Sequence, residues 1–372
     1  MLRVMIDATP LLLRSTGVKT YTYEWIRALR ARGNNGQVSL FPFLGFPSGY
    51  DHERSPLGFV PTALRLAALQ FGNLPGNRAW NLLGRNTDVF HCSNLCRNPP
   101  DNTLLTATLH DMTCWLMPEL HAAGNRKADA NYENRVLRRA NGLIAVSENT
   151  RRDAINILKL PEDRIVAIHP GIAPRFFDVA QSAITRVKAD LKLEKPYVLS
   201  VGTIEPRKNT KRLLAAWKSL PGSLTNAFDL VFAGPIGWDS DDVAAELRAG
   251  RQGIRYLGYV AESDLPGLNA GASALAYPSL YEGFGFPVAQ AMASGVPVVT
   301  SNLSSMPEVA GDAAEYADPK SVESIAAALQ KVLESESLRR ELGDRGRRRA
   351  DNFRWEVTAE KTWHFWERLL GG

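Results

Sequence analysis

The chain has 372 residues, with 44 Lys and Arg against 39 Asp and Glu, and therefore a formal net charge of +5 at neutral pH. Its length exceeds what one ordinary hydrophobic core fills and predicts two domains. The charge is spread along the chain without a dense basic stripe or an aromatic RNP-type motif. No nucleic-acid partner is therefore expected, and anionic small molecules stay as candidate partners.

The three cysteines are Cys92, Cys96 and Cys114, and they form no CxxC pair. This usage fits a reducing cytosol with buried thiols, and it predicts neither a disulfide nor a zinc site. Near the N-terminus Asp7 interrupts the apolar run, and no apolar run approaches the length that crosses a bilayer. We therefore expect a cytoplasmic protein that is not exported through an N-terminal signal and is not integral to a membrane.

Short β-rich runs alternate with segments of helical period through the first half of the chain. The β-rich runs cover residues 2–6, 38–44, 88–93, 104–111, 143–147 and 164–172. Helical segments include residues 21–33 and residues 148–158, for which Ser147 is a suitable N-cap. This alternation is typical of a parallel sheet wrapped by helices.

The pattern begins again in the second half, which predicts a second sheet of the same type. Its β-rich runs cover residues 196–203, 228–234, 254–258, 274–279 and 296–300. The final segment places Trp355, Trp363 and Trp366 near one helical face, and such an apolar stripe needs a surface to pack on. We therefore predict domains at residues 1–175 and 176–354, with residues 355–372 forming a C-terminal helix that packs on the first domain.

The predicted fold class is α/β, with two facing Rossmann-like domains and a C-terminal helix that crosses back to the first. In open α/β sheets, ligands bind at the carboxyl ends of the strands. Two such sheets that face each other predict a cleft between the domains. The residues that directly follow strands are therefore the candidates for function.

In the first domain, two short motifs follow strands. Gly17 opens a helix, and a glycine there lets a ligand approach the backbone and the helix N-terminus. His110 and Asp111 follow a buried strand, where the imidazole can donate to a phosphate or hydroxyl and the carboxylate can accept from a hydroxyl. Structural interpretations stay open: Gly17 as a simple turn glycine and His110 as a strand-end residue without a ligand.

In the second domain, Arg207 and Lys208 follow the first strand. A diphosphate leaving group requires such cations, since Arg binds it in fork geometry and Lys as a point charge. The alternative is a solvated basic loop. Asp239 and Asp241 form a D-x-D motif that could hold a metal and a nucleotide. However, they stand where a helix is predicted to start, and carboxylates at a helix start interact favourably with the helix dipole. We therefore expect no metal.

The stretch "PSLYEGFGFPVAQAMASG" places Glu282 before a glycine-rich turn that leads into a helix. The backbone amides of Gly283, Phe284 and Gly285 are expected to point at a phosphate, and Glu282 can accept from sugar hydroxyls. Gln290 lies one turn into the helix and is expected to face the same cleft. This order suits a sugar nucleotide, with its hexose by Glu282 and its ribose by Gln290.

These motifs resemble those of the retaining glycosyltransferases of family four, whose two-domain arrangement is called GT-B. The similarity covers nearly the whole chain, from the Gly17 loop and the "HD" of His110 and Asp111 to "GTIEPRKN", "YLGYV", "EGFGFP" and "PEVAGDAA". By this resemblance, the Gly17 loop closes over the donor and His110 lies near its sugar and phosphate. The backbone around Tyr259 and Val260 meets the base.

The resemblance also implies that Arg207 and Lys208 neutralise the donor diphosphate and that Glu282 contacts the transferred sugar. This chain departs from the family pattern at two positions. Some relatives have an arginine at the position of Thr203. The second glutamate of the family's E-x7-E motif, which begins here at Glu282, is replaced by Gln290, and this weakens binding of the ribose. In the implied same-face mechanism, the departing phosphate oxygen takes the acceptor's proton. Neither an enzyme nucleophile nor a metal is needed.

The function expected from the sequence is transfer of a hexose from a nucleotide-sugar donor, with GDP-mannose as the best guess. The acceptor would be a glycan or glycolipid hydroxyl in cell-surface polysaccharide assembly, on the cytoplasmic side of the membrane. The alternatives are a sugar-nucleotide epimerase or hydrolase, and an inactive sugar-nucleotide-binding scaffold. The intact Arg207, Lys208, Glu282 and His110 argue against the scaffold.

Residues 55–85 leave a further question open, because Leu64, Ala67, Ala68 and Phe71 share one helical face. Three arginines lie in the same stretch: Arg65, Arg78 and Arg85. An amphipathic helix of this kind packs on the core of its own domain, which is the interpretation we prefer from sequence. The alternative is peripheral contact with a membrane or a lipid acceptor.

Overall fold

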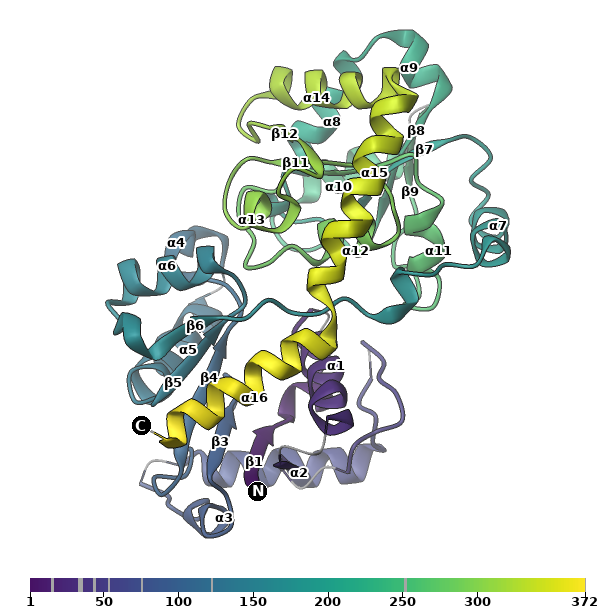
Figure 1. Cartoon of the computed structure of the whole chain (residues 1–372). Coiled ribbons are helices and arrows are strands. Elements are labelled where there is room, and N and C mark those ends of the chain that lie inside the picture. The colour runs from purple at the N-terminus through teal and green to yellow at the C-terminus, as the bar shows by residue number, and fades with distance from the viewer. Residues whose placement is uncertain are drawn as a thin grey trace. The chain divides into compact units, whose positions relative to one another are not determined.

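The computed structural model describes residues 1–14, 17–32, 36–42, 45–52, 54–74, 76–121, 123–250 and 253–371 (Figure 1). The predicted helix end at Gly33 and the last two residues of the run 38–44 lie outside the described residues. The chain divides into two compact units, one of Met1–Gly171 with Trp355–Gly372 and one of Ile172–Arg354. None of the helices in the described part of the chain combines the length and apolar character needed to cross a membrane.

The first unit is built on a six-stranded sheet with the order β2-β1-β3-β4-β5-β6, in which all pairs are parallel. Its strands are β1 (Leu2–Asp7), β2 (Gly36–Phe41), β3 (Val89–Cys92), β4 (Leu104–Leu109), β5 (Gly142–Ala145) and β6 (Ile165–Ala167). Its helices are α1 (Gly17–Ala31), α2 (Phe59–Gly72), α3 (Asn81–Gly84), α4 (Thr113–Leu116), α5 (Ala123–Tyr132), α6 (Glu148–Leu158) and α16 (Trp355–Gly371). Strands β3 and β5 are buried along their whole length, as expected for a parallel sheet covered on both faces.

The C-terminal helix α16 belongs to this first unit and lies beside α1 (Figure 1). Trp363 and Trp366 are fully buried, and the indole of Trp366 donates to the hydroxyl of Thr106 on β4 at 3.3 Å. On α1, the indole of Trp25 donates to the hydroxyl of Thr362 at 3.1 Å. Burial of these large rings is the main stabilising contribution of the helix, because the apolar area that it removes from water is large.

The second unit carries another six-stranded parallel sheet, with the order β12-β11-β10-β7-β8-β9. Its strands are β7 (Tyr197–Val201), β8 (Asp229–Ala233), β9 (Ile254–Tyr256), β10 (Ala274–Tyr277), β11 (Val298–Ser301) and β12 (Ala314–Ala317). Its helices are α7 (Gln181–Asp190), α8 (Thr210–Ser219), α9 (Gly222–Ala227), α10 (Asp241–Ala249), α11 (Leu265–Ala270), α12 (Phe286–Ala293), α13 (Met306–Ala310), α14 (Val322–Glu334) and α15 (Glu336–Ala350). Strand β12 was not predicted, because its sequence AEYA contains no β-branched residue.

The chain passes into the second unit at Ile172, a few residues before the predicted boundary at 175. The backbone N–H of Ile172 donates to the carbonyl of Phe353 at 2.7 Å, and the carbonyl of Phe176 accepts from the hydroxyl of Ser294 at 3.0 Å. These contacts attach the segment after Gly171 to the second unit. The two parallel sheets themselves confirm the predicted α/β class.

Candidate functional site

The loops that follow β7 and β10 form the candidate site of the second unit. These two strands are neighbours in the sheet, so their carboxyl ends lie together. A short 3-10 helix, η6 (Pro206–Lys208), follows β7 and carries two cations. The side-chain amide of Asn209 donates to the carbonyl of Pro278 at 3.0 Å, which fixes η6 against the end of β10.

Glu282 is the centre of a charged cluster in these loops. Its carboxylate accepts from Arg207 Nη1 at 2.7 Å and from Lys208 Nζ at 2.6 Å. The hydroxyl of Tyr277 donates to the same carboxylate at 2.9 Å and itself accepts from Lys208. The other side of the Arg207 guanidinium binds Glu205 at 2.6 Å. Sequence reasoning identified the two cations and Glu282 separately and did not predict that they bind one another.

The charges in this cluster hold Glu282 ionised. Burial would raise the pKa of its carboxyl, but the charges of Arg207 and Lys208 outweigh that effect and lower it to about 2. Burial lowers the pKa of the Lys208 ammonium, which the charge of Glu282 opposes. The side chains of Arg207 and Lys208 are only 17% and 15% exposed, so both cations are far less open than a solvated basic loop would be. That alternative from the sequence is therefore wrong.

The glycine-rich turn after Glu282 is locked by two serines that sequence reasoning missed. The hydroxyl of Ser304 donates to the carbonyl of Glu282 at 2.7 Å and accepts from its backbone N–H at 3.1 Å. Ser305 donates to the carbonyl of Phe284 at 2.9 Å. Gly285 has φ of 103°, a left-handed backbone that favours glycine. The sequence signal for the two serines was their place in the loop that follows β11.

Helix α12 begins at Phe286, with proline in its first turn as the sequence predicted. Gln290 lies one turn into this helix and is half-buried. Its side chain has no hydrogen bond with any residue that the structure describes. Its amide is therefore not satisfied by a neighbouring side chain, which was one alternative to a ligand-binding role. Gly283 and Phe284, ahead of the helix, are buried.

Tyr259 and Val260 follow β9 at the same edge of the sheet, since β9 lies next to β8 and β8 next to β7. Tyr259 is half exposed and Val260 is buried. At the same edge, α10 begins at Asp241, so the D-x-D of Asp239 and Asp241 stands at a helix start as predicted. Nothing places these two carboxylates beside Glu282.

In the first unit, His110 and Asp111 follow β4, and α1 begins at Gly17, as the sequence predicted. The His110 ring packs edge-on against Tyr21, with the ring centres 4.8 Å apart. Burial lowers the pKa of His110 to about 4, an effect that Asp111 opposes, so the imidazole is neutral at pH 7. Asp111 accepts from the backbone N–H and the hydroxyl of Thr113 at 3.0 and 2.7 Å, which fixes the start of α4.

A cavity of about 350 Å³ opens beside His110 and Asp111. Three carboxyl groups line it, those of Asp7, Asp111 and Asp129, and the indole of Trp115 forms part of its wall. No Lys or Arg belongs to its lining among the described residues. The cavity therefore suits a neutral polyhydroxyl group better than a phosphate.

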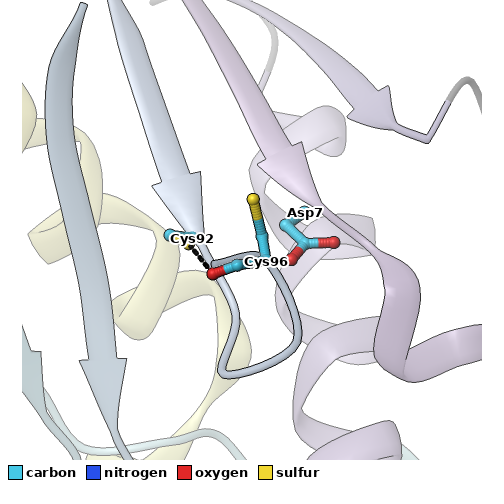
Figure 2. Close-up of side chains that lie close together, drawn as sticks. All are labelled: Asp7, Cys92 and Cys96. Carbon is cyan, nitrogen blue, oxygen red and sulfur yellow. Dashed lines mark hydrogen bonds between the residues drawn. The ribbon is translucent and has the colours of Figure 1, made fainter. Parts of the chain in front are cut away.

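Asp7, Cys92 and Cys96 form a buried cluster at the ends of β1 and β3 (Figure 2), which sequence reasoning did not foresee. Their oxygen and sulfur atoms lie within 4.8 Å of one another, as in many metal sites. However, the Cys92 thiol donates to the carbonyl of Cys96 at 3.4 Å, and Asp7 accepts from Thr9 and Ser93. Burial raises the pKa of both the Asp7 carboxyl and the Cys92 thiol. These hydrogen bonds fit a role of the cluster in holding the loop after β3.

The chain matches two models of glycosyltransferase domains, one in each half. Residues 15–176 match the model described as Glycosyltransferase Family 4, and residues 182–349 match Glycosyl transferases group 1. The O-antigen chain mannosyltransferase B of Escherichia coli is 32% identical over 97% of this chain and 98% of its own length. This chain belongs to the glycosyltransferases of family-four type.

Other relatives match this glycosyltransferase over part of their length. The MMP alpha-(1->4)-mannosyltransferase of Mycolicibacterium hassiacum is 28% identical over 64% of the chain and 56% of its own length. The serotype-specific mannosyltransferase WbdA of Escherichia coli is 29% identical over 62% of the chain, which covers 29% of that protein.

Solved structures of glycosyltransferases share the fold of the whole chain. A sucrose-phosphate synthase from Thermosynechococcus elongatus superimposes with a TM-score of 0.73 at 19% identity, and 100% of both chains is covered. WaaG, a glycosyltransferase involved in lipopolysaccharide biosynthesis, gives 0.69 at 18% identity over 99% of this chain and 100% of its own. The glycosyltransferase therefore has the GT-B fold of two Rossmann-like domains, as the resemblance implied.

Proposed function

We propose that this glycosyltransferase moves mannose from GDP-mannose to a hydroxyl group of a glycan or glycolipid, with retention of configuration. The observation that carries the proposal is the cluster of Arg207, Lys208 and Glu282 at the carboxyl ends of β7 and β10. Two cations held side by side stabilise the charge that grows on a departing diphosphate. Glu282 holds both cations in place before the donor binds.

The state of Glu282 supports a same-face mechanism without an enzyme nucleophile. Its carboxylate accepts from three donors, and its pKa of about 2 makes it a poor base and a poor nucleophile at neutral pH. The proton of the acceptor hydroxyl then passes to the oxygen of the departing phosphate. Glu282 contributes by holding the cations and by accepting a hydrogen bond from a hydroxyl of the transferred sugar.

The remaining donor contacts are proposals from the resemblance. Gly283, Phe284 and Gly285 would approach the diphosphate, Gln290 the ribose, and the backbone around Tyr259 and Val260 the base. In the first unit, Gly17, Asp111 and the neutral imidazole of His110 would complete the donor contacts.

The choice of mannose is supported by relatives named as mannosyltransferases, among them the O-antigen enzyme that covers nearly the whole chain. That relative also supports a place in cell-surface polysaccharide assembly. For the acceptor, the cavity of the first unit supports a neutral saccharide, because carboxyl groups and an indole line it and no cation does among the described residues. We propose a cytoplasmic location, which three buried free thiols favour.

The test is a panel of GDP- and UDP-sugars with neutral mannosides as acceptors, scored by product analysis. Transfer from GDP-mannose with an α-linked product supports the proposal. Free mannose in the presence of acceptor would indicate a hydrolase, and an altered donor would indicate an epimerase. Donor binding without any product would indicate a scaffold. Transfer from a UDP-sugar alone would keep the transferase and reject the choice of donor.

A further inference from the structure

Helix α2 of the first unit exposes apolar side chains along most of its length. Phe59 is 88% exposed, Leu64 66% and Phe71 60%, whereas only Leu69 and Gly72 of this helix are buried. The preferred interpretation from the sequence, a helix packed on its own core, is therefore wrong. The face that was expected to point inward is the face that meets solvent.

The exposed apolar residues continue beyond the end of α2. We name them together the α2 surface: Phe59, Val60, Leu64, Phe71, Leu74 and Leu82. Soluble proteins rarely expose so many large apolar side chains within a short segment unless something covers them. This exposure raises the question of what covers the surface.

The C-terminal end of α2 and the loop after it are attached to the first unit. The side chain of Asn73, at the end of α2, donates to the carbonyl of Leu95 at 2.9 Å and accepts from the backbone N–H of Arg97 at 2.7 Å. Trp80 packs edge-on against Phe41 of β2, with the ring centres 4.7 Å apart. These contacts link the end of α2 to the loop after β3 and link Trp80 to the central sheet.

The segment that carries the α2 surface is basic, and the acidic Asp101 from a later loop lies 3.8 Å from one of its arginines, Arg78. Residues 54–87 contain four arginines and no Asp or Glu. Arg97, which Asn73 holds beside the end of α2, adds a fifth guanidinium group. Arg85 and Arg97 are exposed, and neither forms an ion pair with any residue that the structure describes. With four arginines and no acid, residues 54–87 carry a local formal charge of +4.

We propose that the α2 surface docks on an anionic phospholipid bilayer. An exposed apolar helix inserts its side chains at the boundary between headgroups and acyl chains, and flanking arginines attract anionic headgroups. A second copy of this chain fits less well, because an isologous contact would bring two acid-free, arginine-bearing segments together. This inference goes beyond the transfer reaction, since it does not depend on which donor or acceptor the enzyme uses.

The experiment is flotation of the full chain with vesicles of phosphatidylcholine alone and with a third of phosphatidylglycerol. We expect flotation with the anionic vesicles, much less with the neutral ones, and weakening at high salt. Leu64→Glu and Phe71→Glu should each lower the vesicle partition coefficient by about tenfold or more. Arg85→Glu should lower it severalfold, since each basic group near an anionic surface contributes about fivefold.

Matched controls separate docking from folding. Leu370→Glu places the same charge at an apolar residue of α16 that is 47% exposed, and Arg152→Glu makes the same charge reversal at an exposed position of α6. Both should float like the wild type, and all variants should keep the wild-type circular dichroism and melting temperature. Equal flotation of Leu64→Glu and wild type would overturn the proposal. So would a vesicle-free dimer that Leu64→Glu dissociates, because the α2 surface would then be an interface between copies.

Discussion

At the scale of single residues, Glu282 organises the charged cluster of the second unit. It binds the guanidinium of Arg207 and the ammonium of Lys208 at once, while Tyr277 supplies a third hydrogen bond. A donor diphosphate would meet cations that are already positioned and partly neutralised. If the proposed function holds, substitutions in this cluster should change two properties, the stabilisation of the leaving group and the stability of the second unit.

Arg207→Ala and Lys208→Ala should each lower kcat by about a hundredfold or more, because each removes a cation that stabilises charge on the diphosphate. Each should also lower the free energy of unfolding by roughly 1–3 kcal/mol, since Glu282 stays buried with only one cation. Lys211→Ala, a control on α8 whose ammonium is largely exposed, should change neither property. Steady-state kinetics and urea unfolding measure the two effects. Near-normal turnover in both variants would reject the leaving-group role.

The pH dependence of stability should carry a signature of Glu282. Its pKa is about 2 in the folded chain against an ordinary value of 4.5, so its stabilisation is fully present above pH 4.5 and is lost as the pH falls toward 2. A shift of this size corresponds to about 3 kcal/mol in all. Glu282→Gln cannot release or bind this proton, so its unfolding free energy should fall less steeply between pH 6 and pH 3. Parallel pH profiles of the two proteins would show that Glu282 is not the linked group.

At the scale of elements, the candidate site is formed by two segments at the carboxyl ends of neighbouring strands, a 3-10 helix and a turn. The 3-10 helix η6 presents the cations, and the turn before α12 presents Glu282. The hydroxyls of Ser304 and Ser305 hold that turn from the loop after β11. Three neighbouring strands therefore position one cluster. Gln290 lies one turn into α12, eight residues after Glu282.

Gln290→Glu should lower the KM for the donor severalfold with little change in kcat. An amide accepts one ribose hydroxyl through its oxygen, whereas a carboxylate accepts from both, and charge-assisted hydrogen bonds are about twice as strong. Ribose contacts are alike in the ground state and the transition state, so turnover should not change. Glu282→Ala, the contrasting variant, should lose kcat. An unchanged or higher donor KM in Gln290→Glu would mean that this glutamine does not bind the ribose.

At the scale of the whole molecule, each unit closes around its own sheet and its own core. Chemistry-bearing residues gather at the carboxyl ends of the strands in both: the charged cluster in the second unit and the cavity beside His110 in the first. The α2 surface is a separate feature of the first unit.

Transfer should proceed in excess EDTA, because paired cations take the role that a metal would play beside a diphosphate. The two groups of residues that resemble metal ligands have other roles: Asp241 begins α10, and Asp7 with Cys92 is engaged in hydrogen bonds. Two measurements test whether transfer needs a metal: the activity after chelation and the metal content of the purified protein. Loss of activity that Mg²⁺ or Mn²⁺ restores would contradict the prediction and would direct attention to Asp239 and Asp241.

The alternation of β-rich and helical segments was enough to predict both parallel sheets, because periodicity and capping are local properties of the sequence. The start of α6 after Ser147 and the start of α10 at Asp241 were predicted for the same reason. Strand β12 was missed because its short sequence lacks β-branched residues. The family resemblance identified the candidate residues of both units, although their roles as ligand contacts stay predictions.

By itself, the sequence determined the fold class, the family and the residue types that carry the proposed chemistry, since each leaves a short contiguous signal. Only the tertiary structure decided that Glu282 binds both Arg207 and Lys208. That contact joins residues about 75 positions apart and depends on β10 lying next to β7 in the sheet. The exposure of α2 was decided in the same way: the periodicity of a helix shows that it has an apolar face, but whether the rest of the chain covers that face depends on packing.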